Sequence, residues 1–245
     1  LFPTGEVHIK YCADDIKDDV AYWDISNLDF EFTGSDSIMA LLLRANALKE
    51  AGITIGSLNI PYLPYSRQDR VMTEGEPFSL KVMAELINSI GARTVYLFDP
   101  HSDVAPALIK NVRVIHQHEI FRHYFKDKTD FYLVSPDGGA LKKIYKLAKE
   151  VNPIGVLECS KVRNLSTGEI TDTKLHHFYP LFGKDCYIVD DICDGGKTFI
   201  EVAKKLKELS PGKIHLMVTH GFFTKGLEVF DGLIDHIYTR EGQVK

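Results

Sequence analysis

Three apolar segments of the chain each end in an aspartate-containing loop that leads toward a predicted helix. The segments cover residues 94–98, 131–134 and 187–189, and the loops after them contain DPHSD, SPDGG and DDICDGGKT. Short continuous apolar runs are typical of parallel strands that are covered on both faces. The repeated order of strand, loop and helix predicts an α/β fold with mainly parallel sheets, whose ligands bind at the carboxyl ends of the strands.

The stretch from Cys186 to Leu209 joins one of these strands to a helix. The apolar run stops at Asp190 and Asp191, where the strand is predicted to end. Thr198 and Glu201 have the spacing of a capping box, and apolar residues follow at helical intervals. The helix is therefore predicted to begin near Thr198, which leaves a short glycine-containing loop between strand and helix.

This loop consists of Asp194, Gly195, Gly196 and Lys197. Its backbone N–H groups, with the helix N-terminus behind them, are suited to surround a phosphate. Carboxylates beside a bound phosphate are unfavourable unless they accept hydrogen bonds from a ribose diol or face a divalent cation. The pattern therefore points to a ribose phosphate, whereas the simpler interpretation of the motif alone is a surface turn with a solvated acidic cluster.

Composition argues against several other classes of protein. A chain of 245 residues with 44% hydrophobic residues is long enough for one large or two ordinary α/β domains. The net charge of −5 and the lack of a long Lys/Arg block argue against nucleic acid as the ligand. No apolar run approaches the roughly 20 residues of a membrane span and no signal-peptide pattern is visible, so we expect no membrane contact and a cytoplasmic location. The four cysteines are scattered without a C-x-x-C pair and are expected to be reduced.

Polar side chains also follow the predicted strands of the N-terminal half. Residues 53–60 read as a buried strand that runs into a proline-rich loop with the sequence RQDR at residues 67–70. This position suits ligand contacts, although a solvated loop with local salt bridges is the simpler interpretation of the loop alone. His101 follows the next strand and is suited to bind a cation or a phosphate, or acts only as a hydrogen-bonding residue.

A polar segment follows the strand predicted over residues 152–158. It reads CSKVRNLSTGEITDTKL and shows no apolar period, which predicts a mobile loop. Lys161 and Arg163 lie at alternate positions near its start, so on an extended chain both point the same way. Such a pair is suited to stabilise charge on a transferring phosphate group, and the alternative interpretation is two ordinary surface cations.

Six motifs occur along the chain in the order found in ribose-phosphate pyrophosphokinases, also called phosphoribosyl pyrophosphate synthetases. They are PYLPYSRQDR, DPHSD, SPDGG, SKVR, VDDICDGGKT and VTHGFF, and together they span nearly the whole chain. The chain therefore resembles this family. The resemblance implies two tandem phosphoribosyltransferase-like domains, over residues 1–115 and 116–245, the second carrying the ribose-phosphate loop. It also implies Mg²⁺-dependent transfer of the β,γ-diphosphate of ATP to the 1-hydroxyl of ribose 5-phosphate, in nucleotide biosynthesis.

The resemblance also assigns roles to particular residues. Catalytic roles, in stabilising the transition state, fall to Lys161 and Arg163. ATP contacts fall to Arg67, Gln68 and His101 and, from a neighbouring subunit, to Phe2, Thr4 and Glu6. Ribose-phosphate contacts fall to Asp190, Asp191, Asp194, Gly195, Gly196, Lys197 and Thr198. Metal and polyphosphate contacts fall to His101 and Asp137, and the shared adenine site implies a homo-oligomer built from dimers, up to a hexamer.

One loop departs from the family pattern. The family sequence is Asp-Thr-x-Gly-Thr, whereas residues 194–198 read Asp-Gly-Gly-Lys-Thr, which removes a hydroxyl at Gly195 and adds a cation at Lys197. A second phosphate would suit that cation, so a nucleotide-linked ribose such as ADP-ribose, from NAD metabolism, is an alternative acceptor. Further alternatives are a phosphoribosyltransferase, which leaves RQDR, DPHSD and the Lys-x-Arg pair unused, and a non-catalytic regulatory paralogue, which predicts the loss of that pair.

Overall fold

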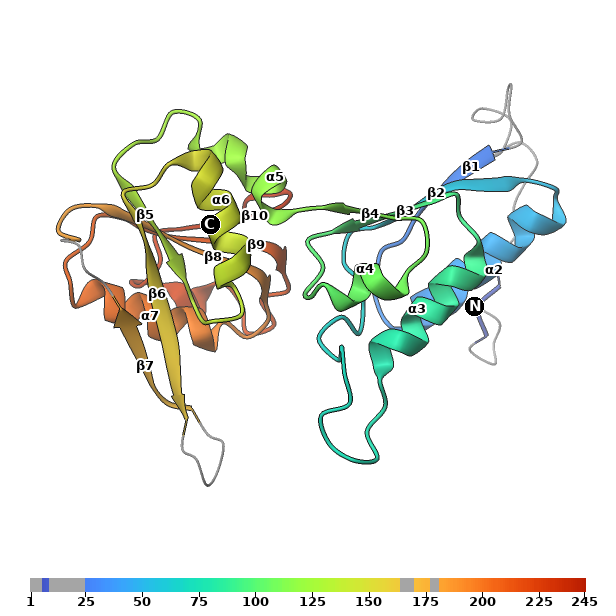
Figure 1. Cartoon of the computed structure of the whole chain (residues 1–245), viewed down its shortest axis with the longest axis horizontal. Helices are drawn as coiled ribbons and strands as arrows, with labels where there is room; N and C mark the ends of the chain where they lie inside the picture. Colours follow the sequence, from blue (N-terminus) through green and yellow to red (C-terminus); the bar gives the residue numbers. More distant parts are fainter. Residues whose placement is uncertain (1–5, 9–24, 164–169, 177–180) are drawn as a thin grey trace. The chain divides into compact units, whose positions relative to one another are not determined.

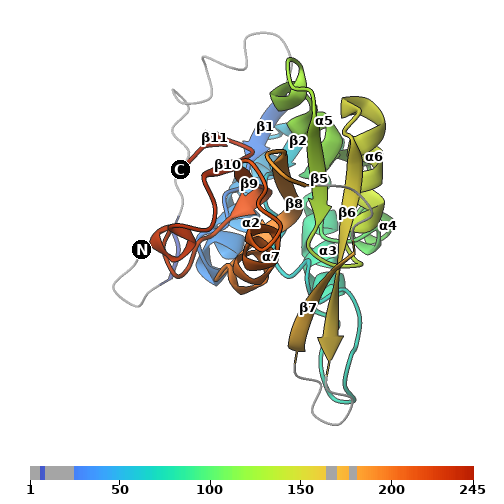
Figure 2. The same cartoon turned by 90° about the vertical axis from the view of Figure 1, so that its left-hand side faces the viewer.

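The computed structural model describes residues 6–8, 25–163, 170–176 and 181–245, with the backbone alone at residues 25, 161–163 and 170–173. The chain forms two compact units, unit 1 over residues 1–115 and unit 2 over residues 116–245. Each unit contains one mainly parallel sheet with helices packed on it (Figure 1, and turned by 90° in Figure 2). The predicted α/β fold with mainly parallel sheets is confirmed.

Unit 1 is built on a four-stranded parallel sheet in the order β1-β2-β3-β4. Its strands are β1 (Ile25–Asp29), β2 (Thr54–Ile60), β3 (Thr94–Phe98) and β4 (Val112–Ile115). Its helices are α2 (Ser35–Glu50), α3 (Ser79–Ile90) and α4 (Val104–Leu108). Leu58 and Leu97 of the sheet share one core with Leu80, Met83 and Ile87 of α3. This core holds the ends of β2 and β3, and therefore the polar loops that follow them.

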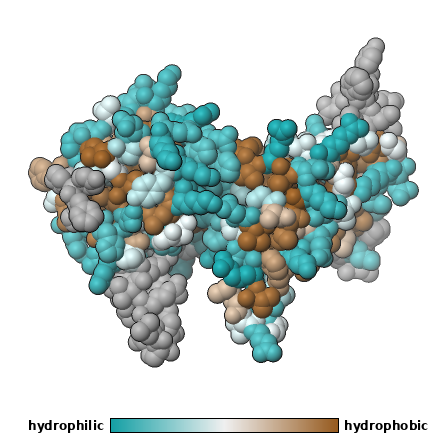
Figure 3. Space-filling view, viewed as in Figure 1, coloured by the Kyte–Doolittle hydropathy of each residue, from teal (hydrophilic) through white to brown (hydrophobic). Residues whose placement is uncertain are grey.

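Apolar side chains also reach the surface of unit 1. Val71, Met72 and Val82 expose 54%, 77% and 55% of their surface. Figure 3 shows apolar surface over α3 and α4. Large exposed apolar patches often mark contacts with another protein, so this face is suited to such a contact.

Unit 2 contains a seven-stranded sheet in the order β11-β10-β9-β8-β5-β6-β7. Its strands are β5 (Phe131–Ser135), β6 (Gly155–Arg163), β7 (Ile170–His176), β8 (Asp185–Cys193), β9 (Ile214–Gly221), β10 (His236–Thr239) and β11 (Gly242–Gln243). Its helical segments are α5 (Gln117–Phe121), η1 (Arg122–Phe125), α6 (Leu141–Val151), α7 (Lys197–Lys207) and η2 (Glu228–Phe230). The five inner strands run parallel, and β7 and β11 pair antiparallel at the two edges.

Helices cover both faces of this sheet, because alternate residues of a strand point to opposite faces. Ile188 of β8 packs in one core with Phe199 and Val202 of α7. Tyr187 and Val189 pack in a second core with residues of η1 and α6. Burial on both faces explains why residues 186–189 of β8 are all apolar. The polar residues that can take part in chemistry lie near the end of the strand.

Two strands of unit 2 extend further than the apolar pattern predicts. β8 continues through Asp190 and Asp191 to Cys193, because its pairing with β9 continues along these residues. β6 continues to Arg163 and pairs with β7 in an antiparallel hairpin, so the prediction of a mobile loop over residues 159–175 is wrong for the described part of that segment. Backbone hydrogen bonds hold such extensions and require no apolar period in the sequence.

The predicted capping box at the start of α7 is also wrong. The helix begins at Lys197, and Gly196 at its N-cap has a φ of 77° and makes no side-chain cap. Glu201 forms an ion pair with Lys204 instead, with a nitrogen–oxygen distance of 2.9 Å. The left-handed glycine turns the chain directly into the helix, so Thr198 is not needed as a cap.

The described helices are too short, or too polar, to cross a lipid bilayer. The longest of them, α2, has 16 residues, whereas a transmembrane helix needs roughly 20 apolar residues. 

Three described cysteines, Cys159, Cys186 and Cys193, are free and buried. Burial is the main cause that raises the pKa of each thiol to about 12. The thiols are therefore protonated at neutral pH and poorly reactive.

His215 of β9 is a buried polar residue with little hydrogen-bonding support. Its ring stacks on Tyr187, with centroids 4.1 Å apart, and on His236, at 5.2 Å. Neither ring nitrogen forms a hydrogen bond within the described residues, and Oδ2 of Asp185 lies 3.6 Å from Nε2, too far for a normal bond. Burial lowers the pKa of His215 to about 4, and the nearby Asp185 charge opposes this only in part.

We expect the stability of unit 2 to fall as the pH drops from about 6.5 toward about 4. Because the folded pKa lies below the unfolded one, the neutral ring is favoured by folding, and this contribution is complete above pH 6.5. The contribution of His215 is at most roughly 3 kcal/mol. Urea unfolding at several pH values should show a smaller loss for His215→Phe, which keeps the stacking but cannot titrate, and the parental loss for His123→Phe, at an exposed site. An NMR titration that gave His215 an ordinary pKa would contradict this account.

Candidate functional site

The candidate site in unit 2 lies where the neighbouring parallel strands β5 and β8 end. Asp137 follows β5, Asp190 and Asp191 lie among the last four residues of β8, and residues 194–198 follow β8. The carboxyl ends of parallel strands meet at the same edge of a sheet, so these acidic and glycine-rich segments lie together. This arrangement agrees with the prediction that the strand ends carry the polar chemistry.

Asp190 is a carboxyl group of this edge whose pKa is strongly raised. Some of the residue remains accessible, but protein atoms surround the carboxyl group. Burial, then the charge of Asp191 and that of Asp137, raise its pKa well above the ordinary value. The backbone N–H of Asp191 donates to Oδ1 of Asp190 at 2.9 Å and offsets only part of this effect. A ligand that donates hydrogen bonds, or a cation, would therefore be favoured beside Asp190.

Asp191 has a cationic neighbour from another element. Its carboxylate Oδ2 lies 3.5 Å from Nζ of Lys143, and both side chains are largely buried. Lys143 belongs to α6, which follows Asp137, so this ion pair links the polar ends of β5 and β8. The sequence analysis missed Lys143, because its separation of 48 residues from Asp191 hides the contact.

The carboxylate of Asp137 is fixed at the turn before α6. Its Oδ1 accepts hydrogen bonds from the backbone N–H groups of Gly139, at 3.0 Å, and Ala140, at 3.3 Å. The hydroxyl of Ser135 donates to the carbonyl oxygen of Asp137 at 2.7 Å. These bonds stiffen the turn and hold a negative charge at the edge of the sheet.

The glycine loop is held against the segment that follows β9. A Cβ atom on Gly196 would lie 2.5 Å from the ring of Phe230, so only glycine fits there. The hydroxyl of Thr224 donates to Oδ1 of Asp194 at 2.7 Å, and the N–H of Thr224 donates to the carbonyl of Asp194 at 3.2 Å. Contacts with Thr224 and Phe230 therefore hold the glycine loop in place. The sequence analysis also missed these two residues.

The N-terminus of α7 behind this loop is suited to bind an anion. Its first turn contains no acidic residue, and Gly196 provides no side-chain cap for its N–H groups. The positive end of the helix dipole therefore faces the loop without a competing carboxylate in that turn. Lys197 is exposed and Thr198 partly exposed at this end of the helix.

In unit 1, two loops that are distant in sequence come together. Arg67 and Gln68 lie in the loop after β2, and the N–H of Leu80 donates to the carbonyl of Gln68 at 3.2 Å. Asp69 is buried, and its Oδ1 accepts a bond from Nε of Arg70 at 2.9 Å. That bond lowers the pKa of Asp69, burial opposes it, and a further bond to Ser102 and the proximity of His101 also lower it. The RQDR loop and the DPHSD loop therefore lie close together around Asp69.

The predicted site residues are distributed over both units. Arg67, Gln68 and His101 belong to unit 1, and Asp137, the loop of residues 190–198 and the pair of residues 161 and 163 belong to unit 2. Glu6 is exposed, while Phe2 and Thr4 lie outside the described residues, as do the side chains of residues 161 and 163. Within the described part of the chain, no three His, Cys, Asp or Glu residues form a group that could hold a metal ion. The metal assignment to His101 and Asp137 stays a prediction.

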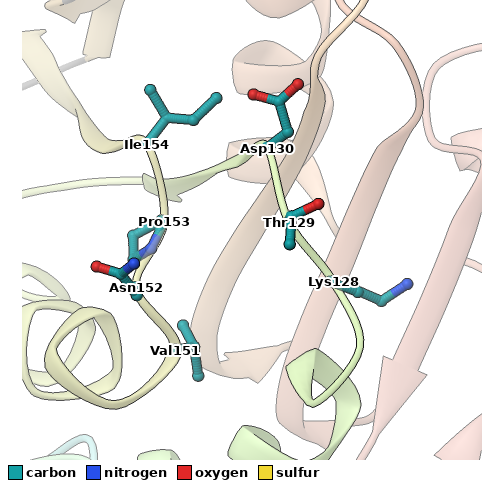
Figure 4. Close-up of a pocket in the computed structure, with 7 residues that line it drawn as sticks. All are labelled: Lys128, Thr129, Asp130, Val151, Asn152, Pro153 and Ile154. Atoms are coloured by element: carbon teal, nitrogen blue, oxygen red, sulfur yellow. The ribbon is translucent and has the colours of Figure 1, made fainter.

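An open pocket of about 310 Å³ occurs elsewhere in unit 2 (Figure 4). It is lined by Lys128, Thr129, Asp130, Val151, Asn152, Pro153 and Ile154. These residues precede β5 and β6, so the pocket lies at the amino ends of parallel strands. The candidate site lies at the opposite ends of the same strands, and the pocket is therefore not part of it.

We expect Gly196→Ala to destabilise the protein more than Gly232→Ala. Both glycines have left-handed backbones, with φ of 77° and 72°, which costs an alanine about 1–2 kcal/mol. A Cβ atom on Gly232 would meet nothing within 4 Å, whereas one on Gly196 would strike Phe230, adding about 1–3 kcal/mol. Urea unfolding measures the difference, and equal losses for the two variants would show that the contact with Phe230 is unimportant.

Comparison with known proteins identifies relatives of both units. Residues 2–91 match the model of the N-terminal domain of ribose phosphate pyrophosphokinase, and residues 104–228 match that of the phosphoribosyl transferase domain. The chain is 35% identical over 198 residues to a ribose-phosphate pyrophosphokinase of Pyrococcus abyssi, covering 78% of this chain and 66% of that protein. It is 31% identical over 230 residues to one of Thermococcus kodakarensis, covering 92% of this chain and 77% of that protein.

A solved structure supports the fold. The phosphoribosylpyrophosphate synthetase of Mycobacterium smegmatis superposes with a TM-score of 0.74 at 21% identity, covering 88% of this chain and 71% of that chain. At this level of identity the match concerns the fold alone. Together with the two family models, it confirms the expected pair of phosphoribosyltransferase-like domains.

Proposed function

This chain belongs to the ribose-phosphate pyrophosphokinase family, and we propose that it transfers the β,γ-diphosphate of ATP to the 1-hydroxyl of ribose 5-phosphate. The products are phosphoribosyl pyrophosphate and AMP. The observation that carries the proposal is the family match through both units. A phosphoribosyltransferase would need only the domain that matches unit 2, and it would leave the N-terminal match to unit 1 without a role.

The charge pattern of unit 2 supports a sugar phosphate as the acceptor. The 5-phosphate binds at the N-terminus of α7, where no acidic residue occupies the first turn. The ribose hydroxyls donate hydrogen bonds to Asp190 and Asp191, whose crowded charges favour such donors. The phosphate of the acceptor thus faces the positive end of a helix dipole, and its hydroxyl groups face carboxylates.

ATP is assigned mainly to unit 1. Arg67, Gln68 and His101 bind the nucleotide, and Phe2, Thr4 and Glu6 reach the adenine of a neighbouring subunit. The proximity of Asp69 to Ser102 and His101 supports this assignment, because it shows that the loops of Arg67 and His101 lie close together. A stable arrangement of these two loops is what a polyphosphate site needs.

The residues of this chain fit Mg²⁺ as the cofactor. Mg²⁺ is usually bound by one or two protein groups together with substrate phosphates, rather than by a complete protein cage. Asp137 of unit 2 offers one carboxylate of that kind, and His101 of unit 1 stays the second predicted ligand. When bound with ATP, Mg²⁺ supplies charge neutralisation on the phosphate oxygens.

The transfer itself requires positioning and charge stabilisation. The 1-hydroxyl oxygen forms a bond to the β-phosphorus as the bond from that phosphorus to the α-phosphate oxygen breaks; the hydroxyl proton leaves, and AMP is released. No protein nucleophile is needed. Lys161 and Arg163 stabilise the negative charge that accumulates on the transferring group. Both lie on β6, so the hairpin of β6 and β7 carries them.

The alternative acceptor ADP-ribose is not favoured. Lys197, the cation on which that alternative rested, is exposed and forms no hydrogen bond or ion pair with a described residue. The relatives are named for ribose phosphate, and the Lys-x-Arg pair that a regulatory paralogue would lose is present at residues 161–163.

A product assay tests the proposed function. Purified protein with ATP and Mg²⁺ is incubated with ribose 5-phosphate or with ADP-ribose, and the products are analysed by mass. We expect phosphoribosyl pyrophosphate and AMP from ribose 5-phosphate and a far slower reaction with ADP-ribose. Free ribose 5-phosphate left unchanged under all conditions would refute the proposal.

The proposal includes a cytoplasmic homo-oligomer, built from dimers, up to a hexamer. Exposed apolar side chains of unit 1, such as Met72 and Val82, support self-association. The shared adenine site makes the oligomer necessary for activity. We expect light scattering of the active protein to give at least a dimer, and a fully active monomer at assay concentration would contradict this.

Lys161→Ala and Arg163→Ala are each expected to lower kcat by about 10²–10³-fold, because both act on charge in the transition state. The thermal midpoint should change little, since both residues lie on a hairpin at the edge of the sheet. Lys174→Ala is the matched control, because Lys174 is an exposed lysine of β7 opposite Ser160. Turnover of the first two variants at the parental level would remove them from the mechanism.

A further inference from the structure

The stem of Lys225 lies across the glycine loop of unit 2. A Cβ atom placed on Gly195 would be 3.4 Å from both Cδ and Cε of Lys225 and 3.6 Å from its Cγ. The aliphatic part of the lysine therefore lies directly beside the space that a Cβ atom at position 195 would fill, at van der Waals distance. Lys225 follows β9 and lies 30 residues from Gly195 in sequence, so only the fold brings the two together.

Hydrogen bonds hold this part of the chain on the loop. The N–H groups of Phe222 and Phe223 donate to the carbonyl of Cys193, at 2.8 and 3.3 Å. Thr224 donates to Asp194 twice, from its hydroxyl at 2.7 Å and from its N–H at 3.2 Å. Residues immediately before Lys225 are therefore tied to residues immediately before Gly195, which makes the position of Lys225 a property of the fold.

The ammonium group of Lys225 is available to a ligand. The residue is exposed, and it forms no hydrogen bond or ion pair within the described part of the chain. The carboxylate of Asp194, next to Gly195, already accepts the hydroxyl of Thr224. The first turn of α7 adds no acidic residue that would neutralise a cation here.

We propose that Lys225 binds the phosphate of the acceptor sugar, in place of the hydroxyl that the family loop supplies at the position of Gly195. The family sequence Asp-Thr-x-Gly-Thr places a threonine there, and this chain has glycine. A Cβ atom at position 195 would lie in van der Waals contact with the stem of Lys225, so the two positions are neighbours and a change at one is expected to affect the other. The proposal rests on the proposed function, because it assigns a residue to the same phosphate site.

The exchange has a clear chemical consequence. A threonine hydroxyl offers a neutral hydrogen bond, whereas an ammonium group offers a charge-assisted one to a phosphate dianion. Loss of such a charged contact weakens binding by about 10–100-fold. The effect should fall on acceptor binding rather than on turnover, because the 5-phosphate is remote from the reacting 1-hydroxyl and is bound in both ground and transition states.

The first test removes the charge and keeps the stem. For Lys225→Met we expect KM for ribose 5-phosphate to rise about 10–100-fold with little change in kcat or in KM for ATP. Calorimetric titration with ribose 5-phosphate alone should show the same loss of affinity, and Lys225→Arg should retain most of it. Lys207→Met is the control, because Lys207 is an exposed lysine at the far end of α7.

The second test restores the family chemistry. Gly195 is not among the glycines with positive φ, so its backbone accepts a threonine. Gly195→Thr combined with Lys225→Ala should bind ribose 5-phosphate more tightly than Lys225→Ala alone, whereas Gly195→Thr in the parent should bring a smaller gain, because Lys225 beside it already binds the phosphate. Additive effects of the two substitutions would show that the residues are not a pair.

The outcomes separate this inference from the proposed function. A parent protein that forms no phosphoribosyl pyrophosphate refutes the function itself. A parent that forms it, with Lys225→Met unchanged in KM and in calorimetric affinity, refutes only the role of Lys225. A fall in kcat at constant KM would likewise overturn a role in phosphate binding.

Discussion

Crowding of carboxylates at the carboxyl ends of β5 and β8 is the constraint on which the candidate site depends. Asp190 is surrounded by protein and lies near Asp191 and Asp137, so its pKa is raised. The ion pair with Lys143 relieves part of this repulsion. The anion-binding end of α7 lies one short loop away and contains no acid in its first turn. A small ligand with hydroxyl groups at one end and a phosphate at the other satisfies both environments at once.

Much of the fold could be predicted because buried parallel strands leave a direct record in the sequence. β3 occupies residues 94–98 as predicted, and β8 shows the apolar run that burial on both faces requires. The failures have a different origin. The hairpin of β6 and β7 is held by backbone pairing, which polar sequences also permit, and α7 starts at a left-handed glycine rather than at a capping threonine.

Only those parts of the site whose residues lie close to one another in the sequence could be predicted. The loop of residues 194–198 and Asp137 were identifiable because each directly follows an apolar strand. The contacts that brace them join Lys143 to Asp191 and Thr224 to Asp194, which depend on β5 and β9 both lying beside β8. The order of the strands along the chain does not determine which of them become neighbours in the sheet. For the same reason, the proximity of Asp69 to Ser102 could not be predicted from the sequence.

The hairpin changes how the pair proposed to be catalytic, Lys161 and Arg163, should be understood. On a regular strand, residues 161 and 163 would face the same side. In β6 the pairing register shifts between Val162 and Arg163, the mark of a bulge, and bulges re-aim side chains and often lie beside active sites. Alternation alone therefore does not set the direction of Arg163. A hydrogen-bonded ladder also restricts the backbone of residues 161 and 163 more than an unpaired loop would, so the proposed contact with the phosphates would cost less backbone entropy.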